Sequence, residues 1–249
     1  MDDRDFVLFG LPHCAALAAT VVASIYMVKL NRSPRVSPQR KHRANVILGI
    51  ILITAVMLDP PLTWWQYRDR PDTAWQQVRD VSLPLYLCDV VSLVLACALI
   101  RRKQRWAEIG YLWGMAGTMQ GLITPSLYFS WDTPQYYAFF AQHGGVPVAA
   151  LALAFGTDLK PQRGAFLRAV FWSWVHMAVV GTLNLLISDK ANYGFLREKP
   201  GVGTMFDYMG PGHSYLLTLQ VIAFTLYALL LLPFRNQKPT DSPALADGV

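Results

Sequence analysis

Charged residues are scarce in this chain. They make up 15% of its 249 positions, whereas apolar residues make up 53%, a balance more typical of a membrane protein than of a soluble domain. Cysteine is also rare, and three cysteines cannot pair completely within one chain. Two of them, Cys14 and Cys97, fall in apolar segments and are interpreted as small hydrophobic residues. The first five residues are acidic overall and lack the basic start of a cleaved signal peptide, so we expect the first apolar segment to be retained.

Three further absences narrow the function. The apolar segment 214–234 has no lysine, which excludes a retinal Schiff base in the last predicted helix. No two histidines are four residues apart, so the helical pair of zinc ligands is missing. No internal repeat is visible, whereas a transporter would favour one.

Long apolar runs dominate what is present. Seven of them lie at residues 8–29, 44–64, 81–100, 107–126, 137–157, 168–188 and 214–234. Each is close to the ~20 residues that a helix needs to cross ~30 Å of hydrocarbon. The sequence therefore predicts an all-α membrane protein, a polytopic bundle of seven transmembrane helices in residues 1–235. The polar residues 236–249 have little to bury and are predicted to form a disordered cytoplasmic tail.

The distribution of Lys and Arg predicts the topology. The connections 31–43, 101–106 and 158–168 and the tail after Phe234, with the nearest embedded charges, hold 15 Lys/Arg and 4 Asp/Glu. The other side holds 7 Lys/Arg and 12 Asp/Glu. Because the basic side of a membrane protein faces the cytoplasm, we expect a multi-pass protein of the cell (inner) membrane, N-out and C-in. The basic patches are interpreted as lipid headgroup contacts and not as a nucleic-acid site. Trp131, Tyr136 and Tyr137 on the outer side are typical of an interfacial aromatic belt.

Glycine recurs through the segment 107–126, at Gly110, Gly114, Gly117 and Gly121. These positions form two small-xxx-small pairs, which allow neighbouring helix backbones to approach closely. We expect this segment to pack tightly against other helices.

Polar side chains inside the predicted helices gather in their outer halves. Cys88 and Asp89 lie about two turns into the third segment, ~10 Å deep by helical rise. Gln142 and His143 reach a similar depth in the fifth. A cysteine and a histidine at matched depth allow nucleophilic acyl chemistry, because an imidazole can take the thiol proton and the thiolate can then form a thioester.

Asp89 requires a partner of its own. A lone carboxylate two turns into hydrocarbon is costly unless a cation or a hydrogen-bond donor meets it. The candidates are His143, His213 and Arg79.

The chain is similar to a known family at several short motifs. The stretch LPLYLCD at 83–89, Thr124-Pro125 and YYAFFAQH at 136–143 resemble the YwaF-type bacterial membrane protein family. They also resemble the eukaryotic transmembrane protein 164 family, described as acyltransferases acting on ether phospholipids. The resemblance covers the third to seventh segments and continues through His176, Asn192, Pro200 and Gly212-His213. One position departs from it, because the eukaryotic relatives have a histidine after the cysteine where this chain has Asp89.

The resemblance implies a membrane-embedded lipid acyltransferase with Cys88 as its nucleophile. The predicted catalytic residues are Cys88, His143, His213 and Asp89, with His143 as general base and His213 as the second candidate. The predicted substrate-binding residues are the polar side chains of the outer half: His176, Gln120, Thr124, Gln142, Asn184, Asn192, Tyr193 and Lys199. Asn192 or a backbone N–H of residues 199–204 is the candidate oxyanion donor. The predicted partners are membrane phospholipids or lysolipids, with no cofactor, no metal and no nucleic acid; the oligomeric state is left open.

Two alternatives remain open. A zinc-dependent membrane lipid hydrolase would need three ligands from His143, His213, Asp89, Cys88 and His176. A non-enzymatic protein would use the same polar residues for ligand binding, transport or scaffolding.

Overall fold

The computed structural model describes residues 6–125, 127, 129–200 and 205–236, and this part of the chain is built from helices without strands. The all-α fold predicted from the sequence is confirmed. Nearly all of the predicted disordered tail, residues 237–249, lies outside the described residues, as do residues 201–204 of the candidate oxyanion turn.

Among the residues that the structure describes, five helical segments are long and apolar enough to cross a membrane. They are α1 (Leu11–Arg32), α2 (Pro38–Gln66), α7 (Pro134–Gly156), α8 (Ala165–Ile187) and α9 (Ser214–Leu231) with the short turn η5 (Leu232–Phe234). They coincide with five of the seven predicted segments. The chain is therefore a multi-pass membrane protein by the length and composition of its helices.

The third predicted segment, 81–100, is broken rather than continuous. A short helix α3 (Pro71–Gln77) leads into the π-helical turn η1 (Val78–Ser82), and α4 (Leu87–Arg101) follows after a bend of 66°. Leu83 is extended, with φ −68° and ψ 147°, because the residue before a proline is biased away from helical conformation. The break at Pro84 starts a new helix one residue before Cys88.

The fourth predicted segment, 107–126, is divided into three helical pieces. These are α5 (Gln104–Trp113), the π-helical turn η2 (Gly114–Thr118) and α6 (Met119–Ile123). Five spans are thus recognised by length and apolarity, or six if the bent pair around Pro84 is one span. The predicted count of seven spans is not confirmed, and the N-out, C-in orientation stays a prediction.

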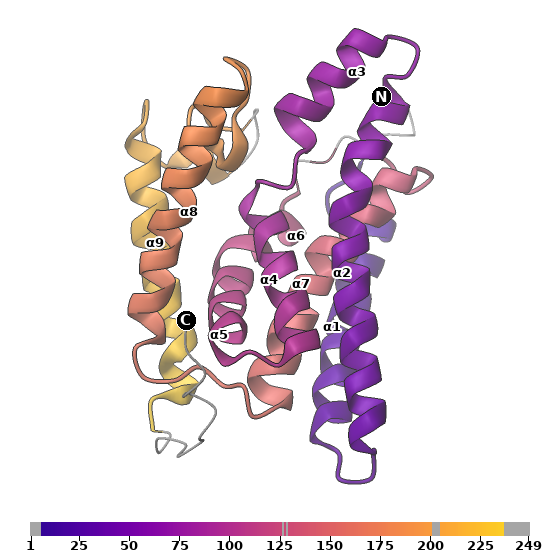
Figure 1. The fold of residues 1–249 in the computed structure, drawn as a ribbon, viewed down its shortest axis with the longest axis vertical. Helices are drawn as coiled ribbons and strands as arrows, with labels where there is room; N and C mark the ends of the chain where they lie inside the picture. The colour runs from indigo at the N-terminus through magenta and orange to yellow at the C-terminus, as the bar shows by residue number, and fades with distance from the viewer. Residues whose placement is uncertain (1–5, 126, 128, 201–204, 237–249) are drawn as a thin grey trace.

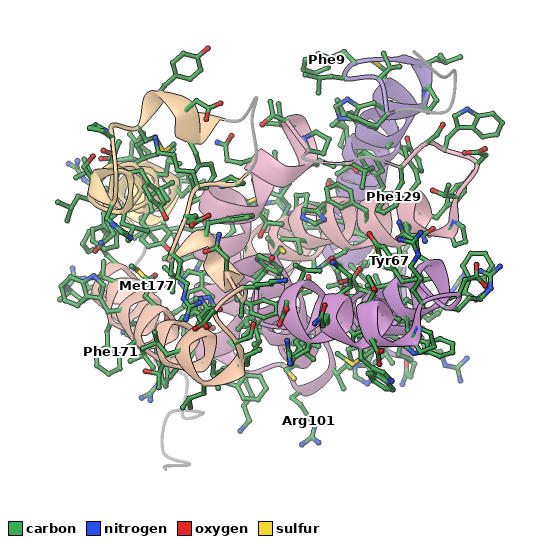
Figure 2. All side chains as sticks on the ribbon, turned by 90° about the horizontal axis from the view of Figure 1, so that it is seen from above. Phe9, Tyr67, Arg101, Phe129, Phe171 and Met177 are labelled. Carbon is green, nitrogen blue, oxygen red and sulfur yellow. The ribbon has the colours of Figure 1, made fainter. Side chains whose placement is uncertain are left out.

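The helices form a bundle with α4, α5 and α7 at its centre (Figure 1). On one side α1 packs on α7, and α2 packs on both α4 and α7. At the opposite edge α8 lies beside α9, and α8 packs against α5, one of the three central helices. The large core cluster joins residues of all these helices except α1. At the periphery apolar side chains project outward. Phe171 of α8 is 57% exposed, and Figure 2 shows it at the edge of the molecule. Such a surface suits contact with lipid chains.

The predicted close packing of the glycines is confirmed. A Cβ placed at Gly110 would lie 2.6 Å from the Leu95 side chain of α4. At Gly114 it would lie 2.8 Å from Val146 of α7, and at Gly117 it would lie 2.7 Å from Leu87 of α4. The glycines therefore let the 104–123 segment approach α4 and α7.

Candidate functional site

Asp89 joins α4 to α7 at the beginning of α4. Its Oδ2 accepts a hydrogen bond of 3.0 Å from the backbone N–H of Tyr86, which caps the helix. Its Oδ1 accepts a hydrogen bond of 2.7 Å from the side-chain amide of Gln142. A carboxylate at a helix N-terminus is also favoured by the helix dipole. These donors differ from the three predicted candidates, and Arg79 instead pairs with Asp80 at 2.9 Å.

Cys88 directs its thiol to the same carboxylate. The distance from Cys88 Sγ to Asp89 Oδ1 is 3.8 Å, and the side chain is half-buried. The Cys88 carbonyl accepts a hydrogen bond of 2.6 Å from Ser92 Oγ, which ties the first turn of α4 together. The thiol of α4 and the amide of α7 therefore converge on one carboxylate oxygen.

His143 follows Gln142 on α7 and is buried. Its Nδ1 lies 3.0 Å from the carbonyl oxygen of Phe139, and its ring stacks on the Phe139 ring at 3.9 Å between centroids. A carbonyl only accepts, so we assign the proton to Nδ1, which leaves Nε2 unprotonated in the neutral ring. A Cβ at Gly121 of α6 would lie 2.9 Å from this Nε2. The glycine thus leaves the space that the imidazole occupies.

Five of the predicted site residues lie in three neighbouring helical pieces, and a sixth, Thr124, directly follows one of them. Cys88 and Asp89 belong to α4, and Gln142 and His143 to α7. Gln120 lies in α6 beside Gly121, and its carbonyl accepts a hydrogen bond of 3.2 Å from Thr124 Oγ1 at the exposed end of that helix. The Cys88 thiol donates to Asp89 Oδ1, whereas a histidine is the proton acceptor predicted from the sequence.

Asn184, in the last turn of α8, forms a structural pair with Tyr193, which follows that helix. Asn184 Nδ2 donates to the Tyr193 carbonyl at 2.9 Å, and the Tyr193 N–H donates to Asn184 Oδ1 at 2.9 Å. The Tyr193 hydroxyl donates to the Arg79 carbonyl and accepts from the Leu83 N–H, each at 2.9 Å. Burial raises the pKa of the Tyr193 phenol to about 12, so the hydroxyl remains a donor at neutral pH. These bonds attach the short helix η3 (Tyr193–Phe195) to the break before α4.

Asn192 and Lys199 also make contacts within this connection. Asn192 Nδ2 donates one of its two N–H groups to the Glu198 carbonyl at 2.8 Å, and its predicted role as an oxyanion donor stays a prediction. Lys199 Nζ donates to the Gly210 carbonyl at 2.5 Å and lies 5.8 Å from the centroid of the Tyr215 ring. The connection continues through η4 (Met205–Tyr208) to α9.

The two remaining histidines lie on the α8–α9 side. His176 is half-buried on α8, with its ring centroid 5.7 Å from that of Trp113. His213 is exposed at the beginning of α9. Their predicted roles in binding and catalysis stay predictions.

Two further polar residues of this end were missed by the sequence analysis. His13 of α1 is fully buried; its Nδ1 accepts from the Phe9 N–H and its Nε2 donates to the Leu122 carbonyl, each at 3.0 Å. Tyr136 of α7 is buried and was interpreted only as an interfacial aromatic residue. A histidine inside the apolar run 8–29 was the signal that could have indicated the first.

The zinc alternative requires three converging ligands. Among the residues that the structure describes, no three His, Cys, Asp or Glu side chains gather in a way that could hold a metal ion. His143, His213, Asp89, Cys88 and His176 therefore do not supply the ligand set that this alternative needs.

A comparison with known protein families finds a match that covers most of the chain. A family model described as the TMEM164 family matches residues 8–231. No curated protein and no solved structure shows a significant match.

Proposed function

The chain belongs to the TMEM164 family, and from this premise and the geometry around Asp89 we propose that it is a membrane-embedded lipid acyltransferase. In this proposal Cys88 is the nucleophile, and the substrates are membrane phospholipids and lysolipids. The resemblance of 83–89 and 136–143 to acyltransferase sequences supports the choice of reaction.

One observation carries the proposal. Asp89 Oδ1 lies 3.8 Å from the Cys88 thiol and 2.7 Å from the Gln142 amide. The Cys88 sulfur therefore has a possible proton acceptor beside it, and that acceptor is held in place by the helix that carries His143. Nucleophile, acceptor and positioning group form the arrangement that covalent acyl transfer needs.

The first half of the reaction breaks the ester of the donor lipid. The Cys88 proton passes to Asp89, so the pair keeps a single negative charge. The thiolate attacks the ester carbonyl carbon, the carbon–oxygen bond to the lysolipid breaks, and the leaving oxygen takes the proton from Asp89. The products are an acyl thioester on Cys88 and a lysolipid.

The second half transfers the acyl group to an acceptor lysolipid. The hydroxyl of the acceptor gives its proton to His143 and attacks the thioester carbonyl carbon, the carbon–sulfur bond breaks, and the Cys88 thiolate takes up the same proton from His143. We assign His143 as general base for this hydroxyl, because its Nε2 is the unprotonated ring nitrogen.

Replacing Cys88 tests the covalent mechanism. We expect Cys88→Ala to lower acyl exchange between labelled phospholipids and lysolipids at least about a hundredfold, because the nucleophile is removed. Mass spectrometry of the wild-type protein should find the acyl adduct on Cys88.

The other two cysteines are matched controls. Cys14 is exposed on α1 and Cys97 is half-buried on α4, so Cys14→Ala and Cys97→Ala should retain exchange. Full exchange activity in Cys88→Ala would contradict the covalent mechanism, whereas absence of exchange in the wild-type protein as well would favour ligand binding or scaffolding by the same cluster.

A further inference from the structure

A second group of polar side chains surrounds a cavity at the end of the bundle opposite Cys88. Its volume is about 480 Å³, which is within the range of ligand sites, about 300–1,000 Å³. Its walls are the end of α1, the first turns of α2, the residue that follows α4 and the end of α7. This is the end at which α1 joins α2, the lower one in Figure 1. The cavity is thus large enough to take a polar headgroup.

Positive charge exceeds negative charge around this cavity. Lys41, His42 and Arg102 line it, whereas Asp158 is the one carboxylate among its described lining residues. Asp158 is 76% exposed and pairs with Arg102 at 2.5 Å. Lys41 is half-buried, and its ammonium group forms no hydrogen bond or ion pair within the described part of the chain. A concave site with this surplus of cations attracts an anion.

The backbone of Arg102 gives an independent reason to look for a ligand here. Its φ of 53° and ψ of 39° lie in the left-handed region, directly after α4 ends. Glycine is the usual residue at such a position, because a side chain there adds steric strain. A strained arginine in a cavity wall indicates a use for its side chain. The bond to Asp158 occupies one N–H of the guanidinium, and the group carries several more.

Hydrogen bonds between the helices fix the walls of the cavity. Asn31 of α1 and Asn45 of α2 are both buried and exchange side-chain hydrogen bonds of 2.9 and 3.2 Å. Arg32, at the end of α1, donates from Nε to the Phe155 carbonyl of α7 at 2.5 Å. Because these bonds join α1 to both α2 and α7, the walls are positioned before a ligand binds, which lowers the ordering cost of binding.

The level of the cavity in the membrane indicates a lipid as the source of the anion. Three candidate spans leave the hydrocarbon here, since α1 ends at Arg32, α2 begins at Pro38 and α7 ends at Gly156. Phospholipid phosphates lie at this level, and basic pockets between the ends of transmembrane helices suit anionic headgroups. The positive end of the α2 dipole adds to the attraction.

We propose that this cavity binds the phosphate of an anionic phospholipid, with Lys41 and Arg102 as the residues that contact it. Lys41 supplies a single cationic donor, and the guanidinium of Arg102 suits the oxygens of a phosphate. Arg102 follows Cys88 by 14 residues, ~20 Å along a helix axis. The site is therefore separate from the proposed reacting groups and does not rest on the acyl transfer.

Lipid titrations on the purified full chain in detergent test the site. The probes are phosphatidylglycerol, which is anionic, and phosphatidylcholine with the same acyl chains, which is zwitterionic. Dissociation constants are measured by native mass spectrometry. We expect phosphatidylglycerol to bind about 10- to 30-fold more tightly, because two cations meet its headgroup. Combining Lys41→Gln with Arg102→Gln should lower this preference to below about threefold.

Two further variants separate the cavity from the general charge of this end. Arg40→Gln combined with Arg43→Gln removes the same charge from exposed positions of α2 that do not line the cavity, and this control should keep the preference. Asp158→Asn should tighten phosphatidylglycerol binding about threefold, because the competing carboxylate is lost. All three proteins should unfold near the wild-type temperature without lipid, since exposed charges contribute little to stability.

Equal binding of the two lipids by the wild-type protein would overturn the proposal, as would a preference that survives loss of Lys41 and Arg102. An equal loss in both double variants would also overturn it, because the preference would then reflect surface charge alone. Inorganic phosphate is the soluble probe. If it binds as tightly as phosphatidylglycerol and depends on the same two residues, the cavity belongs to a soluble phosphate compound and the lipid is rejected.

Discussion

At the scale of single residues, Gly121 determines where the imidazole of His143 can lie. A Cβ at this position would be 2.6 Å from His143 Cδ2 and 2.9 Å from Nε2. The ring is fixed on its other side by Phe139, which stacks on it and accepts from Nδ1. Because the ring has contacts on both sides, a single added methyl group must displace it.

We expect Gly121→Ala to lower acyl exchange about 10- to 100-fold by moving the imidazole from its working position. The accompanying overpacking should cost about 1–3 kcal/mol of stability. Exchange rate and unfolding temperature are measured on the same preparation. Gly181→Ala is the control, since a Cβ there meets only Leu196 at 3.7 Å, an ordinary contact. Equal exchange by both variants would show that the position of His143 has no part in the reaction.

At the scale of elements, Glu108 organises the end of the bundle opposite Cys88. Its side chain is 1% exposed and pairs with Arg168 of α8 at 2.6 Å. It also accepts hydrogen bonds from the Gln104 side chain at 2.9 Å and from the Gln162 N–H at 3.1 Å. One carboxylate thereby joins α5, α8 and the connection before α8.

Removing this carboxylate should be strongly destabilising. We expect Glu108→Ala to cost about 3–5 kcal/mol, because Arg168 and two further donors lose a buried acceptor. The unfolding temperatures of Glu108→Ala and the wild-type protein, measured in detergent, give this difference in stability.

The control is the pair of Arg102 and Asp158, joined at 2.5 Å with side chains that are 51% and 76% exposed. Asp158→Ala should change stability by less than about 1 kcal/mol, because surface ion pairs contribute little. If both variants unfold at the wild-type temperature, the Glu108 network does not hold these elements together.

At the scale of the whole molecule, the basic connections gather at one end. Arg102 contacts Asp158, Gln104 donates to the Lys160 carbonyl at 2.6 Å, and Arg32 donates to the Phe155 carbonyl at 2.5 Å. Contacts of the Asp89 group join the other ends of α4 and α7. The helices thus run between a basic end and an end that carries the candidate site. Such a separation of Lys and Arg from the opposite end is expected for a membrane protein whose orientation is set by these residues.

A reporter that is active only outside the cytoplasm tests the orientation. Fused after residue 236 it should be inactive, because the predicted N-out, C-in topology places the C-terminus inside. Fused at Ser188, before α9, it should be active. Seven crossings would place the two termini on opposite sides of the membrane, whereas six would leave them on one side. A strong signal from the C-terminal fusion would reject the predicted orientation, and a strong signal from both fusions would show that α9 does not cross the membrane.

The sequence alone determined the helical membrane fold, the basic end and the close approach of the glycine-rich segment. It did so because a helix in hydrocarbon satisfies its backbone locally, so that length and composition suffice. The break at Pro84 was equally local, although the prediction of a continuous segment overlooked it.

Only the tertiary structure decided which groups meet at the site. Gln142 and not a histidine bonds to Asp89, Asn192 uses its amide within its own connection, and the charged ends of α2 and α4 meet at one cavity. Residue spacing gives the depth and the face of a side chain along one helix. The partner of that side chain depends on how neighbouring helices are rotated and how closely they approach, and both are set by packing between segments far apart in the chain.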